Sequence, residues 1–105
     1  MKTQNSELRK LLNIRKQEYD IRLEIEKNSK PDAYFKPKLE LLQKERNKIC
    51  NQLESKLLTL TPTEYKVFEL RYLKGYLPRI IAKRLNYSIS TIQHKLTLVN
   101  KKLRT

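Results

Sequence analysis

The chain has 105 residues and a formal net charge of +13, from 24 Lys and Arg against 11 Asp and Glu. This length fits one small domain, or a small domain with an appended helical element, and one Gly with four Pro leaves too few turn residues for an all-β sandwich or barrel. We expect no signal peptide, and no apolar run approaches the roughly 20 residues that span a bilayer. The chain also has a single cysteine. We therefore predict a cytoplasmic chain with no disulfide, no cysteine–zinc site and no membrane contact.

The basic charge is concentrated in the second half of the chain. Residues 1–60 contain 14 basic and 9 acidic residues, whereas residues 61–105 contain 10 basic and 2 acidic residues. Nine basic residues but no acidic residue follow Glu69. A surface of one sign is typical of proteins that bind nucleic acid, and mixed signs are typical of solvated helix faces. We therefore predict two parts, 1–59 and 60–105, of which the second faces double-stranded DNA.

Residues 1–59 are predicted to form two long helices. The first runs from about Ser6 to Asn28 with apolar residues at helical spacing, and the segment 28–32, which contains Pro31, breaks the pattern. The second begins near Pro37, which suits a first helical turn, and its heptad-like apolar stripe continues to Leu57. Two such helices joined by a loop form an antiparallel, coiled-coil-like hairpin.

A hairpin of two helices leaves apolar surface uncovered, so we expect it to pack on a second copy or on residues 60–105. We favour a homodimer over a purely structural scaffold. The expected oligomer interface consists of Leu11, Ile14, Ile21, Ile25, Leu39, Leu42, Ile49 and Leu53. Glu18 and Arg46 interrupt the two apolar stripes, and we expect them to pair and to fix the register.

Residues 60–105 begin with a strong helix-start signal. Thr61 is suited to cap the helix, Pro62 fits the first helical position, and Glu64 completes a capping box. Gly75 is expected to end this helix, because glycine tolerates the left-handed terminal conformation.

Two further helices follow. Pro78 is expected to begin the first, and the turn at residues 86–88 ends with Ser88, a cap for the second. The predicted inner face of the last helix is Ile92, Leu96, Val99 and Leu103. A short turn between two such helices is the helix-turn-helix arrangement, so the predicted fold class is all-α, a helical hairpin followed by a three-to-four-helix helix-turn-helix domain.

The residues of this second part carry a family resemblance. The stretch Leu60 to Gly75, LTPTEYKVFELRYLKG, resembles the opening of region 4 of bacterial sigma factors and the related helix-turn-helix of response regulators. Ile81 to Ile92, IAKRLNYSISTI, is similar to the core of the same motif. The order of a helical segment followed by this module is similar to small phage and mobile-element regulators of the ArpU and RinA type.

The resemblance implies a DNA-reading role for the last helix, which enters the major groove. It places Ser90, Thr91 and His94 at base-facing positions; Gln93 projects from the same surface, and Thr97 lies one turn further along. A Gln side chain binds adenine bidentately, and hydroxyl groups serve either donor or acceptor edges. The expected phosphate contacts are Arg71, Arg79, Lys83, Tyr87, Ser88 and Lys95.

Two positions depart from the family pattern. Leu77 stands where a Ser or Thr cap is usual, and Ile80 stands where an acid usually precedes the Ile-Ala pair. No segment resembles the sigma regions that melt promoter DNA, so we expect a region 4-like subunit or a separate regulator rather than a complete sigma factor.

An enzyme is not expected, because the sequence has no Gly-rich phosphate loop, no paired-His metal pattern and only one His. No cofactor, metal or small-molecule substrate is expected either. The predicted function is a sequence-specific, dimeric transcription regulator encoded by a phage or mobile element. The alternatives are a factor that binds RNA polymerase or another DNA-handling machine, and a DNA-recognition subunit of a phage packaging complex.

Overall fold

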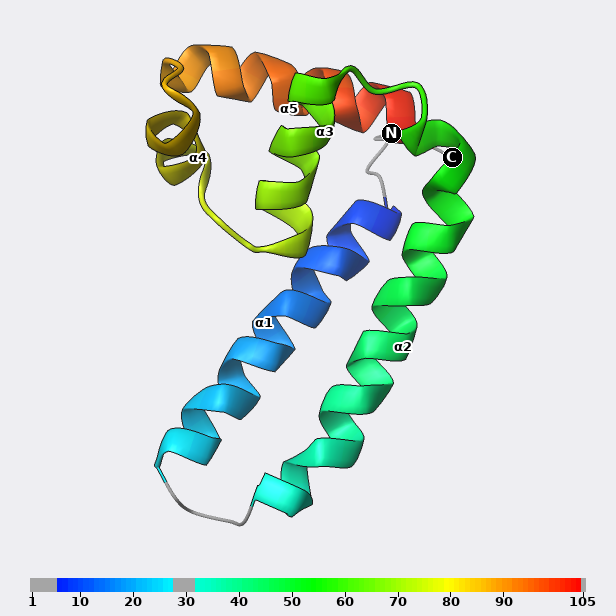
Figure 1. The fold of residues 1–105 in the computed structure, drawn as a ribbon, viewed down its shortest axis with the longest axis vertical. Coiled ribbons are helices and arrows are strands. Elements are labelled where there is room, and N and C mark those ends of the chain that lie inside the picture. The colour runs from blue at the N-terminus through cyan, green and yellow to red at the C-terminus, as the bar shows by residue number, and fades with distance from the viewer. Residues whose placement is uncertain (1–5, 28–31, 105) are drawn as a thin grey trace.

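The computed structural model describes residues 6–27 and 32–104. The elements are α1 (Ser6–Glu26), α2 (Asp32–Leu57), α3 (Pro62–Phe68), the π-helix η1 (Glu69–Leu73), α4 (Pro78–Leu85) and α5 (Ile89–Leu103) (Figure 1). The prediction of an all-α fold is confirmed.

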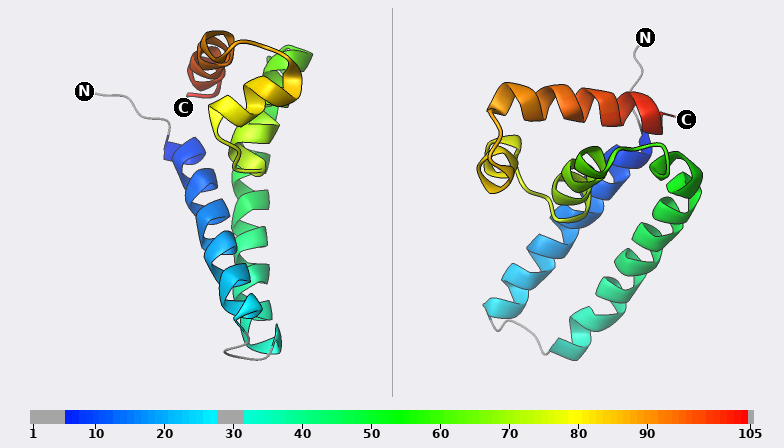
Figure 2. Two further views of the ribbon diagram at one scale, coloured as in Figure 1. Left: turned by 90° about the vertical axis from the view of Figure 1, so that its left-hand side faces the viewer. Right: turned by 45° about the horizontal axis from the view of Figure 1, so that its top comes forward.

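The first two helices, α1 and α2, lie antiparallel and side by side. The remaining helices gather at the end of this pair that is farthest from the connection between α1 and α2, and α5 runs across that end (Figure 1, Figure 2). The predicted chain break at 28–32 falls, apart from Asp32, outside the described residues.

The start of α2 corrects the sequence prediction. The helix begins at Asp32 rather than near Pro37, so Pro37 lies inside it. An internal proline removes a backbone hydrogen bond at a cost of about 3 kcal/mol. Phe35 is buried, and its ring meets the edge of Tyr34 at a centroid distance of 5.0 Å. Burying such a side chain contributes roughly 1.5–3 kcal/mol, so the early turn is retained because it places Phe35 in the interior.

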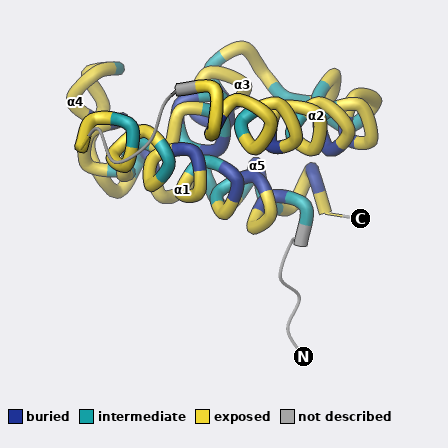
Figure 3. The backbone as a smooth tube through the Cα atoms, turned by 90° about the horizontal axis from the view of Figure 1, so that it is seen from below, coloured by how far each residue is buried: buried dark blue, intermediate teal, exposed yellow. Residues whose placement is uncertain are grey.

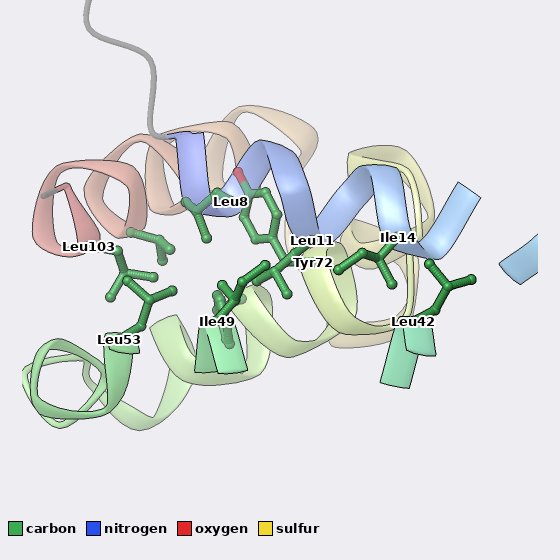
Figure 4. Close-up of a cluster of buried hydrophobic side chains, with 10 residues drawn as sticks. Leu8, Leu11, Ile14, Leu42, Ile49, Leu53, Tyr72 and Leu103 are labelled. Atoms are coloured by element: carbon green, nitrogen blue, oxygen red, sulfur yellow. The ribbon is translucent and has the colours of Figure 1, made fainter. Parts of the chain in front are cut away.

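One hydrophobic cluster joins the two parts that the charge pattern distinguishes. Buried positions of α1 and α2 face inward, and exposed positions face solvent (Figure 3). Side chains from α1, α2, α3, η1 and α5 meet in this main cluster (Figure 4), whose buried members are Leu8, Leu11, Ile14, Leu42, Ile49, Leu53, Phe68, Tyr72, Val99 and Leu103. The hairpin is therefore packed against α3–α5 through a shared apolar interior.

The π-helix η1 connects this cluster to a second one. The second cluster holds Val67, Leu70, Ile81, Ala82 and Ile92. The wider π-turn carries Leu70 into the second cluster and Tyr72 into the main cluster, and the Tyr72 hydroxyl accepts a hydrogen bond from Asn100 Nδ2 at 3.1 Å. Such single-turn insertions re-aim side chains within a helix.

The expected oligomer-interface residues divide into two groups. Those near the shared core are buried by their own chain, namely Leu11, Ile14, Leu42, Ile49 and Leu53. Ile21, Ile25 and Leu39, nearer the connection between α1 and α2, are half-buried. Five of the expected residues are therefore covered by their own chain, and the other three keep part of their surface exposed.

Glu18 and Arg46 pair across the hairpin, as predicted. Glu18 is 4% exposed, and its Oε1 accepts hydrogen bonds from Arg46 Nη2 and from Arg15 Nη1, the latter at 3.3 Å. The pair joins α1 to α2 at one register.

We expect the Glu18→Leu substitution to lower the free energy of unfolding by about 2 kcal/mol. This loss is smaller than the roughly 3–5 kcal/mol for breaking a fully buried pair, because the Arg46 side chain is 16% exposed and keeps some contact with water. The double variant Glu18→Leu, Arg46→Leu is expected to recover most of that loss, since apolar groups of similar volume often replace an ion pair at little cost. Urea denaturation of the wild type, both single variants and the double variant measures the coupling. Additive losses would contradict it.

The predicted capping box at the start of α3 is confirmed. Glu64 N donates to Thr61 Oγ1 at 3.2 Å, and Thr61 N donates to Glu64 Oε1 at 3.0 Å. Glu64 is buried and also accepts from Lys102 Nζ at 2.7 Å. The hydrogen bond from Lys102, followed by that from Thr61, holds the pKa of Glu64 below its usual value.

This lowered pKa predicts a stability change in acid. The contribution of Glu64 is present above its unfolded pKa of roughly 4.3 and is lost as the pH falls through the lower folded pKa. We expect Glu64→Gln to cost about 1 kcal/mol near neutrality, and the difference from wild type to shrink as the medium is acidified. Urea denaturation of both proteins across this range measures it, and a difference that does not change with pH would contradict the assignment.

Candidate nucleic-acid interface

The turn between α4 and α5 sets the direction of the last helix. Asn86 adopts a left-handed conformation with φ 63°, which Asn tolerates at the end of a helix. Ser88 Oγ then accepts from Thr91 N at 3.2 Å and caps α5 as predicted. Leu77, at the start of α4, makes no side-chain cap, as its apolar side chain predicts. The two helices therefore pack through Ile81, Ala82 and Ile92 with a fixed turn between them.

The outer face of α5 carries the residues expected to read bases. Ser90, Gln93, His94 and Thr97 are exposed, whereas the predicted inner residues are buried or, for Leu96, half-buried. Spacings of three and four residues place these four side chains on one side of the helix. The packing of the opposite side thus leaves a polar face open along the first half of α5.

Some of these side chains already have partners within the helix. Thr91 is half-buried, and its Oγ1 accepts from Ser88 Oγ at 2.9 Å. Thr97 Oγ1 donates to the Gln93 carbonyl at 3.0 Å. Across the described part of the chain, no hydrogen bond engages the side-chain amide of Gln93 or the imidazole of His94. These two groups are therefore the best placed to form new bonds.

The residues expected to contact phosphate differ in their exposure and in the partners they already have. Arg79 and Lys83 are exposed on α4. Tyr87 is exposed in the turn, and Lys95 Nζ lies 5.7 Å from the centre of its ring. Arg71, by contrast, donates from Nη1 to the carbonyl of Tyr76 at 3.1 Å and braces the loop that precedes α4. Ser88 is engaged in its capping role.

One cation near this surface was not among the predicted contacts. Arg84 on α4 lies over the Tyr76 ring, with its guanidinium carbon 4.6 Å from the ring centre. Its place in a run of like charges was visible in the sequence, but its stacking on Tyr76 depends on how the loop folds.

The charge of this surface is not offset by free carboxylates. The two acids of α3 and η1 are both paired, Glu64 with Lys102 and Glu69 with Lys66 at 3.6 Å. The described residues after Glu69 contain no acid. The α3–α5 segment therefore presents an excess of positive charge, which attracts polyanions.

The described residues also bear on metal binding, thiol chemistry and membrane insertion. Residues 6–27 and 32–104 contain no group of three or more His, Cys, Asp and Glu side chains placed to hold a metal. Cys50 is half-buried beside the main cluster, and burial raises the pKa of its thiol. None of the helices in these ranges has the length and apolar character that a membrane span requires.

Comparison with known proteins gives one family. A family model described as ECF sigma factor matches residues 9–105. This range includes most of the α1–α2 hairpin as well as the α4–α5 unit, so it extends well beyond the two stretches, Leu60 to Gly75 and Ile81 to Ile92, that carry the resemblance. The chain matches no curated protein and no solved structure.

Proposed function

Because the chain belongs to the ECF sigma factor family, we propose that it is a sequence-specific transcription regulator that reads the DNA major groove with α5. Membership gives the chain a sigma-like role in transcription, and it implies DNA and RNA polymerase as partners. The family consists of regulators rather than enzymes. The sequence specificity, the reading helix and a cytoplasmic, phage or mobile-element setting are our proposal.

The observation that carries this proposal is the polar, exposed face of α5 within a surface of positive charge. In helix-turn-helix proteins the first turns of the second helix contact base edges. Gln93 supplies an amide that matches adenine, and a neutral His94 supplies a donor for a guanine acceptor. Ser90 is exposed one turn earlier on the same face.

The cations around this face would position the protein on the duplex. We propose phosphate contacts from Arg79, Lys83 and Lys95, with Tyr87 donating its hydroxyl. Such contacts do not distinguish one base from another, but each neutralised phosphate steepens the salt dependence of binding. Three cations that each neutralise one phosphate would give a slope of about −2.7 for the logarithm of the binding constant against the logarithm of salt concentration.

The hairpin would orient this reading unit. We keep the proposed division into residues 1–59 and 60–105, and we propose that the hairpin holds α5 in place through the main cluster. A homodimer would form through the half-buried Ile21, Ile25 and Leu39 and would read two half-sites spaced by about 34 Å or a multiple of that distance.

Selection of bound fragments from the source genome at physiological salt, followed by footprinting, tests the proposal. A discrete footprint supports sequence-specific reading, and two-fold symmetry within it supports the dimer. Equal and salt-sensitive binding to all fragments would overturn sequence-specific reading and favour the alternative, a factor that acts through RNA polymerase.

A further inference from the structure

A basic cleft lies where α1 meets the loop between η1 and α4. It has a volume of about 550 Å³, and its lining includes Arg15, Lys16, Arg71, Lys74, Tyr19 and Tyr76. No carboxylate lines it. Residues far apart in the sequence therefore bring four cations and two phenol groups to one concave surface outside the outer face of α5.

The walls of this cleft are held by hydrogen bonds to the loop backbone. Arg15 Nε donates to the Lys74 carbonyl at 3.1 Å, and Arg71 braces the same loop at the carbonyl of Tyr76. Gly75 adopts φ +80°, and a Cβ at this position would lie 2.7 Å from Arg15 Cγ. The close approach of Arg15 thus requires glycine, and it fixes the loop against α1.

The two lysines of the cleft remain available to a ligand. Lys16 and Lys74 are exposed, and no carboxylate pairs with either of them in the part of the chain that the structure describes. Glu18 pairs with Arg15 of the cleft wall, and the same carboxylate is shared with Arg46. The cleft therefore carries uncompensated positive charge beside phenol hydroxyls, and both groups bind phosphate oxygens.

The cleft adjoins α4, which carries two of the proposed phosphate contacts. Lys74 to Tyr76 lead directly into α4, where Arg79 and Lys83 are the proposed phosphate contacts, and Arg84 lies over Tyr76. Through Arg84, which lies over a residue of the cleft wall, positive charge on α4 adjoins the cleft. The longest dimension of the molecule is 42 Å, slightly more than one turn of B-DNA at about 34 Å, so a duplex of several turns extends past the bases that α5 would read.

We propose that this cleft binds the backbone of the DNA that flanks the recognition site, so that α1 extends the contact beyond the helix-turn-helix. This inference rests on the proposed function, because it takes DNA to be the ligand of α5. It assigns Lys16 and Lys74 as phosphate contacts that carry no base preference.

The test compares the Lys16→Gln, Lys74→Gln double variant with wild type on two duplexes, one of about four helical turns and one trimmed to about one turn around the bases that α5 reads. On the long duplex we expect the salt slope to fall by about 1.8 for two lost phosphates. The corresponding loss of affinity is about 10-fold at low salt. On the short duplex the two proteins should bind alike.

A matched control removes the same charge elsewhere. Lys36 and Lys44 are exposed on α2 and do not line the cleft, so Lys36→Gln, Lys44→Gln should change binding to the long duplex less than 2-fold by their net charge alone. No loss on the long duplex, an equal loss on both duplexes, or an equal loss in the control would overturn the assignment.

A long duplex without the selected site separates the two proposals. If wild type binds this duplex as tightly as the selected site, sequence-specific reading fails. The salt slopes of wild type and cleft variant on the same duplex still decide whether the cleft contacts DNA.

Discussion

The Leu53→Ala substitution is expected to lower the free energy of unfolding by about 3 kcal/mol and to destabilise α3–α5 together with the hairpin. Leu53 is fully buried on α2. It points into the main cluster toward Leu8 and Leu103 (Figure 4), so its side chain joins the hairpin to the end of α5. Truncation leaves a cavity that α1, α2 and α5 border together, and a small domain has little stability to spare. Urea denaturation followed by circular dichroism measures the loss.

The neighbouring Leu58 provides the control for this experiment. It is 83% exposed, so Leu58→Ala should change stability by less than about 0.5 kcal/mol. Because one cluster spans both parts, we expect wild type and Leu53→Ala each to unfold in a single transition. Two transitions, with only the hairpin weakened, would show instead that residues 1–59 and 60–105 are independent domains.

The features that the sequence predicted well are those decided by near neighbours along the chain. The capping box at Thr61 and the cap at Ser88 each depend on residues three apart, so local propensity is sufficient. Gly75 directly follows the last turn of η1 and has a left-handed φ of +80°. Glycine adopts this conformation more readily than other residues, so the end of the helix was predictable. The Glu18–Arg46 pair was predictable for another reason, since a charge on each apolar stripe needs a partner once the two stripes meet.

The features that the sequence missed depend on contacts between distant segments. The start of α2 before Pro37 is stabilised by the burial of Phe35, which overrides the local preference. The π-turn of η1 places Leu70 in one hydrophobic cluster and Tyr72 in the other, and both clusters are built from distant segments. An apolar stripe also has the same spacing whether its partner is a second copy or the same chain, so the burial of Leu11 and Leu53 within one chain could not be read from the pattern.

The candidate site divides in the same way. The polar face of α5 was predictable because helical spacing separates it from Ile92 and Val99, which are buried. The role of Arg71 as a brace for the loop, and the cleft formed with Lys16 and Lys74, were not predictable. The brace depends on how the loop after η1 folds back toward Arg71. The cleft arises where α1 packs on that loop, which is about 60 residues away in sequence.

The Gln93→Ala, His94→Ala double variant is expected to lose about 100-fold in affinity for the selected site, or roughly 1–3 kcal/mol for each lost base contact. Affinity for DNA without the site should be retained, because both side chains are uncharged in their base-reading form and the surrounding cations remain. The exposed positions of the two residues make a folding defect unexpected.

Competition binding between the selected site and unrelated DNA measures this change as a specificity ratio, which a general loss of affinity does not alter. Gln52→Ala, which removes an exposed amide from α2, is the matched control and should leave the ratio unchanged. The salt slope should also stay the same in the double variant, because the phosphate contacts are intact. A fall in affinity for both kinds of DNA at a constant ratio would place Gln93 and His94 outside the base contacts and would require another face of the protein to read the sequence.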